Sequence, residues 1–254
     1  METVERTYRG KTYKYAFRDG VIKHDYYKDR LVDNLHGLME VILQARGKIE
    51  VLDMATGNGY TAIILADYYR DAIKRLVAYD INPEAVDLAQ HNAGHNNCAD
   101  NIDFRVGSLY EPLHECEKFN LIVSALPPVP ISPEEMAKLP GTTRAHHWIE
   151  STAGPTGRTL LDGMIEGASK HLHEKGYVIT AQADFQNATK HTLDVMREHG
   201  LVGQFLGGPW KKKLHKDMLT VLRRKHIEHL GYTFHQDEDG DDYFTVEVYS
   251  GRRL

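Results

Sequence analysis

Residues 51–66, VLDMATGNGYTAIILA, place an apolar segment, a turn with two glycines and a second apolar segment in direct succession. Ile49–Met54 has the length and character of a buried strand, and Thr61–Tyr69 those of a helix. Gly57 and Gly59 permit backbone angles that a side chain resists, and they let the backbone approach a ligand closely. A strand, a glycine turn and a helix in this order are typical of a doubly wound α/β sheet.

The alternation of strand and helix patterns continues along the chain. Further strands are predicted at Arg75–Asp80, Ile102–Val106, Phe119–Ser124 and Tyr177–Ala181, and helices at Asp33–Arg46, from Asn82 onward, and at Thr159–Glu174 with a stop at Gly176. Near the end, Tyr232–Phe234 and Tyr243–Tyr249 flank an acidic turn and predict an antiparallel hairpin. We therefore expect an α/β fold with a doubly wound, mostly parallel seven-stranded sheet and a C-terminal antiparallel hairpin.

Composition places the chain among soluble globular proteins. Hydrophobic residues make up 41% and charged residues 26% of the 254 residues. No apolar stretch is long enough to cross a bilayer, and the first residues lack the apolar core of a secretory signal, so we expect a cytoplasmic protein without a membrane partner. Cys98 and Cys116 are expected to be unpaired, and no metal-ligand spacing occurs.

Two segments differ in composition from the rest of the chain. Residues 1–33 are polar and rich in tyrosine, so they are interpreted as an N-terminal arm or lid before a main domain at 34–254. A basic run at 211–225 stands out against a net charge of -5. It fits either a solvated helix face or a patch for an acidic or phosphate-bearing substrate.

The carboxyl ends of the predicted strands carry acidic residues. Ligands of doubly wound sheets bind at these ends, and the N–H groups of the following helix favour an electron-rich group. Asp80 ends the second strand, where an acid can accept both hydroxyls of a ribose. Asp53 precedes the glycine turn, where it would repel a pyrophosphate but suit a ligand with an ammonium and a sulfonium, such as S-adenosylmethionine. The letters GNGYTA also fit a dinucleotide pattern, so a NAD-dependent oxidoreductase remains an alternative.

Four segments, in order, resemble the class I S-adenosylmethionine-dependent methyltransferases: VLDMATGNGYTAIILA, AYDINPEAVDLAQHNA, GSLYEPL and FNLIVSALPPVPI. More narrowly, they are similar to the small-domain branch that includes the release-factor glutamine methyltransferases, with AGPTGRTLLDGMI as a later match. The resemblance covers about residues 48–182 and implies a Rossmann-like methyltransferase fold with S-adenosylmethionine as cofactor.

The resemblance also implies roles for individual residues. The cofactor-binding set is Asp53, Ala55, Thr56, Gly57, Asn58 and Gly59 at the methionine end, Asp80 at the ribose, Ile81, Ser108 and Leu109 at the adenine, and Ser124 near the methyl group. Leu126, Pro127 and Pro128 would border the acceptor. Ala55 replaces the first glycine of the D-x-G-x-G pattern, which is acceptable if its φ angle is negative.

The acceptor end departs from the relatives, which read N-P-P-Y. Leu126 stands at the asparagine position and Val129 at the tyrosine position, so the side chain that binds a glutamine amide is missing. Substitute groups are His146 or His147, as a proton acceptor, and Tyr26 and Tyr27 in an N-terminal lid. A surface histidine pair and simple packing of the arm are the alternative interpretations.

The sequence therefore predicts methyl transfer to a nitrogen or oxygen of a small molecule or a protein side chain. A tRNA or rRNA methyltransferase is the alternative within this chemistry; the basic run supports nucleic acid as a partner and the net charge argues against it. A cofactor-binding protein without catalysis is a further alternative, because fold does not fix function. The oligomeric state is left open.

Overall fold

The computed structural model describes residues 3–19, 21, 26–137, 153–214 and 221–254. Its strands are β1 (Thr3–Tyr8), β2 (Lys11–Ala16), β3 (Ile49–Met54), β4 (Ile73–Asp80), β5 (Asp103–Val106), β6 (Phe119–Ser124), β7 (Leu172–Ala183), β8 (Leu201–Lys213), β9 (His235–Gln236) and β10 (Asp242–Arg253). Its helices are α1 (Tyr26–Arg46), α2 (Tyr60–Tyr68), α3 (Pro83–His95), α4 (Pro133–Met136), α6 (Thr159–His171), α7 (Thr192–Glu198) and α8 (Val221–His229), with short 3-10 turns η1 (Ala99–Asn101) and η2 (Asp184–Asn187).

The main sheet follows the order β5-β4-β3-β6-β7-β10-β8, and β9 pairs with β10 as an eighth strand. The five strands from β5 to β7 are parallel, whereas β10 is antiparallel to both of its neighbours. The prediction of a doubly wound, mostly parallel sheet with antiparallel C-terminal strands is confirmed. The strand order reverses between β3 and β6, where Met54 lies opposite Ser124, and such a switch point is where ligands bind.

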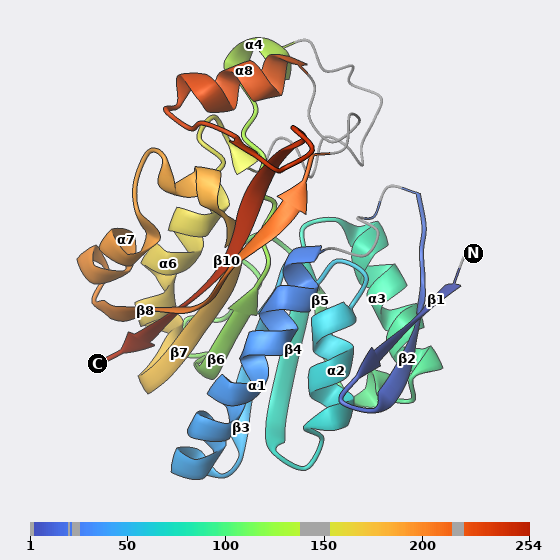
Figure 1. Cartoon of the computed structure of the whole chain (residues 1–254). Helices are drawn as coiled ribbons and strands as arrows, with labels where there is room; N and C mark the ends of the chain where they lie inside the picture. Colours follow the sequence, from blue (N-terminus) through green and yellow to red (C-terminus); the bar gives the residue numbers. More distant parts are fainter. Residues whose placement is uncertain (1–2, 20, 22–25, 138–152, 215–220) are drawn as a thin grey trace.

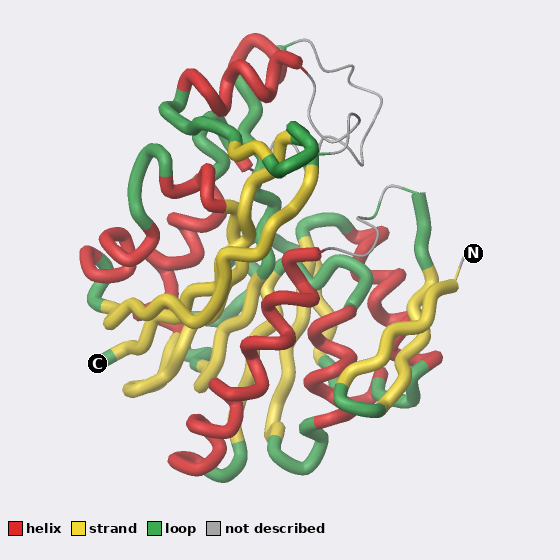
Figure 2. Tube along the Cα trace, in the orientation of Figure 1, coloured by secondary structure: helices red, strands yellow, loops and turns green. Residues whose placement is uncertain are grey.

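Helices cover both faces of this sheet (Figures 1 and 2). On one face α1 and α2 pack on the sheet through a large apolar core that includes Leu35, Met39 and Ile63. On the other face α6 and α7 form a second core through Met164 and Met196. The strands of the sheet centre are apolar on both sides because both faces are covered.

The N-terminal residues form a separate hairpin of β1 and β2, which the sequence analysis did not predict. The side chain of Asn92, in α3, is fully buried and joins this hairpin to the main domain. Asn92 Nδ2 donates to the carbonyl oxygens of Asn58 at 2.9 Å and Ala16 at 3.2 Å, and Asn92 Oδ1 accepts from the Ala16 N–H at 2.7 Å. The end of β2 and the glycine turn therefore share one buried amide.

Several predicted boundaries are wrong. The helix predicted from Asp33 begins at Tyr26, because Leu31 and Val32 continue its buried face, so the predicted division at residue 33 falls inside α1. The helix predicted to reach Glu174 ends at His171, and Gly176 lies within β7.

At the other end of the chain, the main antiparallel partner of β10 is β8, which was not predicted. The predicted strand Tyr232–Phe234 is irregular, and only the two residues of β9 pair there.

The structure also bears on the predictions made for the cysteines and for membrane-spanning helices. Cys98 and Cys116 are both free thiols, as predicted, one buried and the other exposed. Among the described helices, none combines the length and the apolar character that a membrane span requires.

Candidate active site

The glycine turn after β3 is held by backbone hydrogen bonds to its neighbours. The Thr56 N–H donates to the Tyr79 carbonyl at 2.9 Å, and the Gly59 N–H donates to the Thr56 carbonyl at 3.0 Å. Gly57 and Gly59 have φ angles of 58° and 85°. A Cβ atom on Gly59 would lie 3.1 Å from the Cα of Ala89 in α3. Glycine is therefore required here both by backbone conformation and by the close approach of a helix.

Asp80 lies at the end of β4 and faces this turn. Its Oδ2 accepts from the Gly57 N–H at 2.9 Å, and its Oδ1 accepts from the Asn82 N–H at 3.0 Å. Burial raises the pKa of Asp80, and these N–H donors act in the opposite direction. Each oxygen of an ionised carboxylate can accept a second hydrogen bond, which suits the vicinal hydroxyls of a ribose.

Asp53 is the second carboxylate of the site and is only 3% exposed. The Thr56 hydroxyl donates to its Oδ2 at 2.6 Å. Burial raises the pKa of Asp53 to about 6, against the opposing influence of the Lys28 ammonium and the Thr56 hydroxyl. The buried carboxylate thus gains from any further positive charge at the turn.

Lys28 was missed by the sequence analysis. It lies in the first turn of α1, is buried, and donates from Nζ to the Thr56 carbonyl at 2.7 Å. No local sequence signal marks it, because only the fold brings the start of α1 onto the glycine turn.

The expected backbone conformation of Ala55 is wrong. Its φ angle is 58°, in the left-handed region, and not negative. The Cβ of an L-residue crowds the following carbonyl oxygen in this conformation, at a cost of about 1–2 kcal/mol. Ala55 therefore adopts a backbone conformation that favours glycine, with strain.

A narrow, mostly apolar cavity opens beside Ala55. It is lined by Met54, Ala55, Tyr79, Ile81, Gly107, Ser108, Leu109, Leu126 and Leu160. The Tyr79 hydroxyl donates to the Leu109 carbonyl and fixes the wall after β5. The structure thus gathers the residues predicted to surround the adenine. It also adds Leu126, which was predicted on the acceptor side.

The corner after β6 begins at Ser124, whose hydroxyl donates to the Met54 carbonyl at 2.8 Å and joins the two strands of the switch point. Leu126 is buried, whereas Pro127 and Pro128 are partly exposed. A Cβ on Gly157 would lie 2.3 Å from the Pro128 carbonyl oxygen, so the AGPTG segment packs directly on this corner.

Arg158 holds the AGPTG segment in place through Gln186. The sequence analysis did not identify this residue either. Its guanidinium is 2% exposed, pairs with Asp162 at 2.7 Å and donates to the Gln186 carbonyl at 2.8 Å. The Gln186 amide in turn donates to the Gly157 carbonyl at 2.6 Å. A buried arginine with charged and polar partners rigidifies this loop, which packs against the corner after β6.

The predicted lid residues are only partly described. Tyr27 is buried in α1 and stacks on Phe244, with ring centroids 6.3 Å apart. Tyr26 is the first residue of α1. His146 and His147 lie outside the described residues, so their proposed role in proton transfer stays a prediction.

The basic run is divided between a strand and a helix, because Arg223, Arg224 and Lys225 lie on helix α8. Lys211, Lys212 and Lys213 lie on strand β8. The Lys213 ammonium pairs with Asp237 at 2.6 Å, in the acidic turn between β9 and β10. Arg223 pairs with Glu135 of α4 at 2.9 Å. Part of the positive charge is therefore balanced within the chain.

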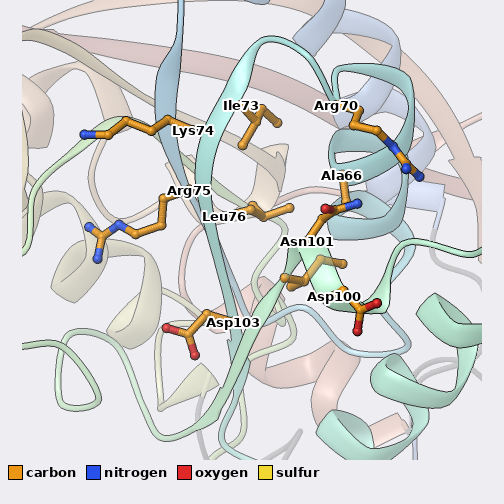
Figure 3. A pocket seen from close by; sticks show the side chains of 10 residues that line it. Ala66, Arg70, Ile73, Lys74, Arg75, Leu76, Asp100, Asn101 and Asp103 are labelled. Carbon is orange, nitrogen blue, oxygen red and sulfur yellow. The ribbon is translucent and has the colours of Figure 1, made fainter.

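A larger hollow lies at the opposite end of the strands, around the start of β4 (Figure 3). Lys74 and Arg75 point away from Arg70 and Asp100 there. Arg75 pairs with Glu117 at 2.6 Å. Ligands of doubly wound sheets bind at the carboxyl ends of the strands, so this hollow at the amino end is not the candidate site.

Comparison with known proteins decides the family. The family described as "Methyltransferase domain" matches residues 46–221, which is more than half of the chain and includes both acidic strand ends and the glycine turn. The chain belongs to the methyltransferase-domain family. The predictions of a methyltransferase fold, of methyl-transfer chemistry and of S-adenosylmethionine as cofactor are confirmed at the level of this domain.

Among curated proteins, the methyltransferase domain is 33% identical over 134 residues to the release factor glutamine methyltransferase of Bacillus subtilis, covering 52% of this chain and 45% of the relative. It is 36% identical over 152 residues to that of Aliivibrio fischeri, covering 60% and 51%. The chain spans 39%, 42% and 45% of the first curated relatives that it matches. The predicted resemblance to the glutamine methyltransferase branch is confirmed.

Among solved structures, the methyltransferase domain is similar to the Thermus thermophilus 16S rRNA N2 G1207 methyltransferase in complex with AdoMet and guanosine. The TM-score is 0.62 at 15% identity, covering all of this chain and 50% of the other. A putative RNA methyltransferase of Pyrococcus horikoshii gives 0.54 at 12% identity, covering 94% and 90%. Likeness at such identity shows the fold alone.

Proposed function

We propose that this chain transfers the methyl group of S-adenosylmethionine to a nitrogen or oxygen of a protein side chain or a small molecule. The observation that carries the proposal is the placement of two buried or partly buried carboxylates, Asp53 and Asp80, on either side of the glycine turn at the switch point. This arrangement suits a ligand that has a ribose at one end and positive charges at the other.

Different residues of the site bind different parts of this cofactor. Asp80 accepts the ribose hydroxyls, and the apolar cavity around Ile81 and Leu109 takes the adenine. Asp53, whose pKa is raised by burial, gains from the ammonium and sulfonium charges. The bound sulfonium supplies an activated methyl group. The chain must then align a nucleophile with the carbon–sulfur bond, and such positioning contributes about 7–11 kcal/mol in the best case.

The acceptor corner argues against a glutamine amide as the substrate. The two curated relatives named above carry that activity in their names, as does a putative protein N5-glutamine methyltransferase of Methanocaldococcus jannaschii, 29% identical over 163 residues. Here the side chain at the acceptor corner is Leu126, which is 5% exposed and lines an apolar cavity. The leucine side chain accepts no hydrogen bond, so the N–H of a glutamine amide would lose a partner at a cost of about 1–3 kcal/mol. The backbone carbonyls of the corner suit an amine, an imidazole or a hydroxyl.

A protein or small-molecule acceptor is favoured over RNA. The net charge is -5, and Lys213 and Arg223 are balanced by carboxylates of the same chain. Binding to RNA depends on Lys and Arg contacts with phosphates, and internal ion pairs weaken that attraction.

The test is methyl transfer from S-adenosylmethionine labelled with tritium in the methyl group. The protein is incubated with a cell extract that is separated into protein, RNA and small-molecule fractions, and with a purified release factor as the amide substrate. We expect label in the protein or small-molecule fraction and little on the release factor. A Leu126→Asn variant should gain activity on the release factor. Label confined to RNA, or efficient wild-type methylation of the release factor, would contradict the proposed acceptor.

A further inference from the structure

Lys28 places a buried ammonium group directly on the glycine turn. Its side chain is 8% exposed, and its Nζ donates to the Thr56 carbonyl at 2.7 Å. The same Nζ lies 2.8 Å from the position that a Cβ atom on Gly57 would occupy. The absence of a side chain at residue 57 is therefore what gives Lys28 its place at the turn.

The Lys28 ammonium makes no direct ion pair with the residues that the structure describes. Among the residues that the structure describes, no carboxylate lies within ion-pair distance of its Nζ, and its recorded partner is a neutral carbonyl. Asp53 and Asp80 are near enough for the ammonium to lower both of their pKa values against the effect of burial. A buried ammonium is costly unless an anion and further hydrogen bonds compensate for the lost water.

The methionine part of S-adenosylmethionine carries both of the charges that this turn needs. Its ammonium complements Asp53, and its α-carboxylate is an anion that can accept from the Lys28 ammonium. An ionised pair of this kind gives a short, charge-assisted hydrogen bond. Resting on the proposed function, we propose that Lys28 binds the α-carboxylate of the methionine part of S-adenosylmethionine.

This assignment gives α1 a part in the cofactor site. Lys28 stands in the first turn of a helix that precedes β3, outside the segment of about residues 48–182 that resembles known methyltransferases. Lys28 already joins the start of α1 to the glycine turn, so the bound carboxylate would make this part of α1 a wall of the cofactor site.

The experiment compares two ligands that differ only in the carboxylate. S-Adenosylhomocysteine keeps the amine and the carboxylate, whereas S-adenosyl-3-thiopropylamine keeps the amine and lacks the carboxylate. Isothermal titration calorimetry measures the dissociation constant of each ligand for the wild-type chain, for Lys28→Met and for Lys28→Gln. Lys48→Met, which removes an exposed lysine before β3, is the matched control.

The wild-type chain and Lys48→Met should bind S-adenosylhomocysteine about tenfold to a hundredfold more tightly than the amine. Lys28→Met and Lys28→Gln should bind both ligands with nearly equal affinity. If either variant weakens both ligands by the same factor, Lys28 has only a structural role and the assignment is wrong. A wild-type chain that does not distinguish the ligands also overturns it. A wild-type chain that binds neither ligand overturns the proposed function itself.

Discussion

The backbone N–H of Gly57 donates a hydrogen bond to Oδ2 of Asp80 at 2.9 Å, so the turn after β3 is fixed to the end of β4. The other carboxylate oxygen accepts from the Asn82 N–H at 3.0 Å. Asp80 therefore shapes the glycine turn, and the remaining lone pairs of both oxygens could accept hydrogen bonds from the proposed cofactor.

Replacing Asp80 by asparagine should weaken cofactor binding. The amide keeps the size of the side chain but loses the charge and turns one acceptor into a donor, so one ribose hydroxyl loses its partner. We expect the dissociation constant for S-adenosylhomocysteine, measured by calorimetry, to rise about tenfold to a hundredfold. Asp87→Asn, an exposed acid in α3, should bind like the wild type. Equal affinities for wild type and Asp80→Asn would remove Asp80 from the cofactor site.

Replacing Ala55 by glycine should not destabilise the protein. The left-handed φ of 58° costs alanine about 1–2 kcal/mol, which exceeds the extra entropy of about 0.5–1 kcal/mol that glycine loses on folding. We expect a free energy of unfolding that is unchanged or higher by about 1 kcal/mol, measured by urea denaturation. Ala45→Gly, at an exposed position of α1, should lower it by about 0.5–1 kcal/mol. A loss of stability for Ala55→Gly as large as that for Ala45→Gly would show that Ala55 carries no strain.

The ionisation of Asp53 should make cofactor binding depend on pH. Burial raises its pKa to about 6, so below this pH the carboxyl group is largely protonated and loses its attraction for an ammonium. The affinity for S-adenosylhomocysteine should rise as pH increases from 5 to about 6 and level off above it. Calorimetry in two buffers of different ionisation enthalpy should also detect a proton released on binding.

Asn at position 53 provides the control for this dependence. The Asp53→Asn variant has no ionisable group there, so its affinity should be weaker and constant over the same pH range. A wild-type affinity that is already constant between pH 5 and 7 would show that Asp53 does not bind the charged end of the cofactor.

Glu117 should stabilise the fold in a manner that acid removes. It pairs with Arg105 at 2.8 Å and Arg75 at 2.6 Å, and the hydrogen bonds from Arg105 are the largest cause of the lowering of its pKa to about 2. For a lowered carboxyl pKa, the stabilisation is complete above the unfolded value near 4.5 and is lost as pH falls toward 2.

The variant Glu117→Gln should therefore unfold more easily than the wild type at pH 7, by about 1–3 kcal/mol in urea denaturation. The difference should shrink as the pH is lowered from 4.5 toward 2. Glu115→Gln, an exposed neighbour, should match the wild type at every pH. A deficit for Glu117→Gln that does not change with pH would point to packing and not to charge.

The centre of the fold could be predicted from the sequence because its signals are local. β3 and β6 have the predicted bounds, since each is a short apolar segment that is buried on both faces. β8 was missed because Gly207, Gly208 and Pro209 resemble a turn and its three lysines resemble a helix face. An edge strand tolerates such residues because one side of its backbone has no partner strand.

The proximity of the candidate site residues could be predicted where it depends on neighbouring strand ends. Asp53, Gly57 and Asp80 lie together because the strand ends of a parallel sheet meet at one edge. Lys28 and Arg158 could not be predicted, because their partners are set by tertiary packing and lie far away in the sequence. The φ angle of Ala55 was predicted wrongly because alanine alone does not reveal which backbone conformation the turn imposes.

The buried amide of Asn92 gives the N-terminal hairpin a part in supporting the glycine turn. A chain that lacks the hairpin would leave this amide with an unmatched donor and an unmatched acceptor next to the glycine turn, where Asn92 donates to the Asn58 carbonyl. Removal of the hairpin would therefore weaken the support of the glycine turn without changing any residue that is proposed to bind the cofactor.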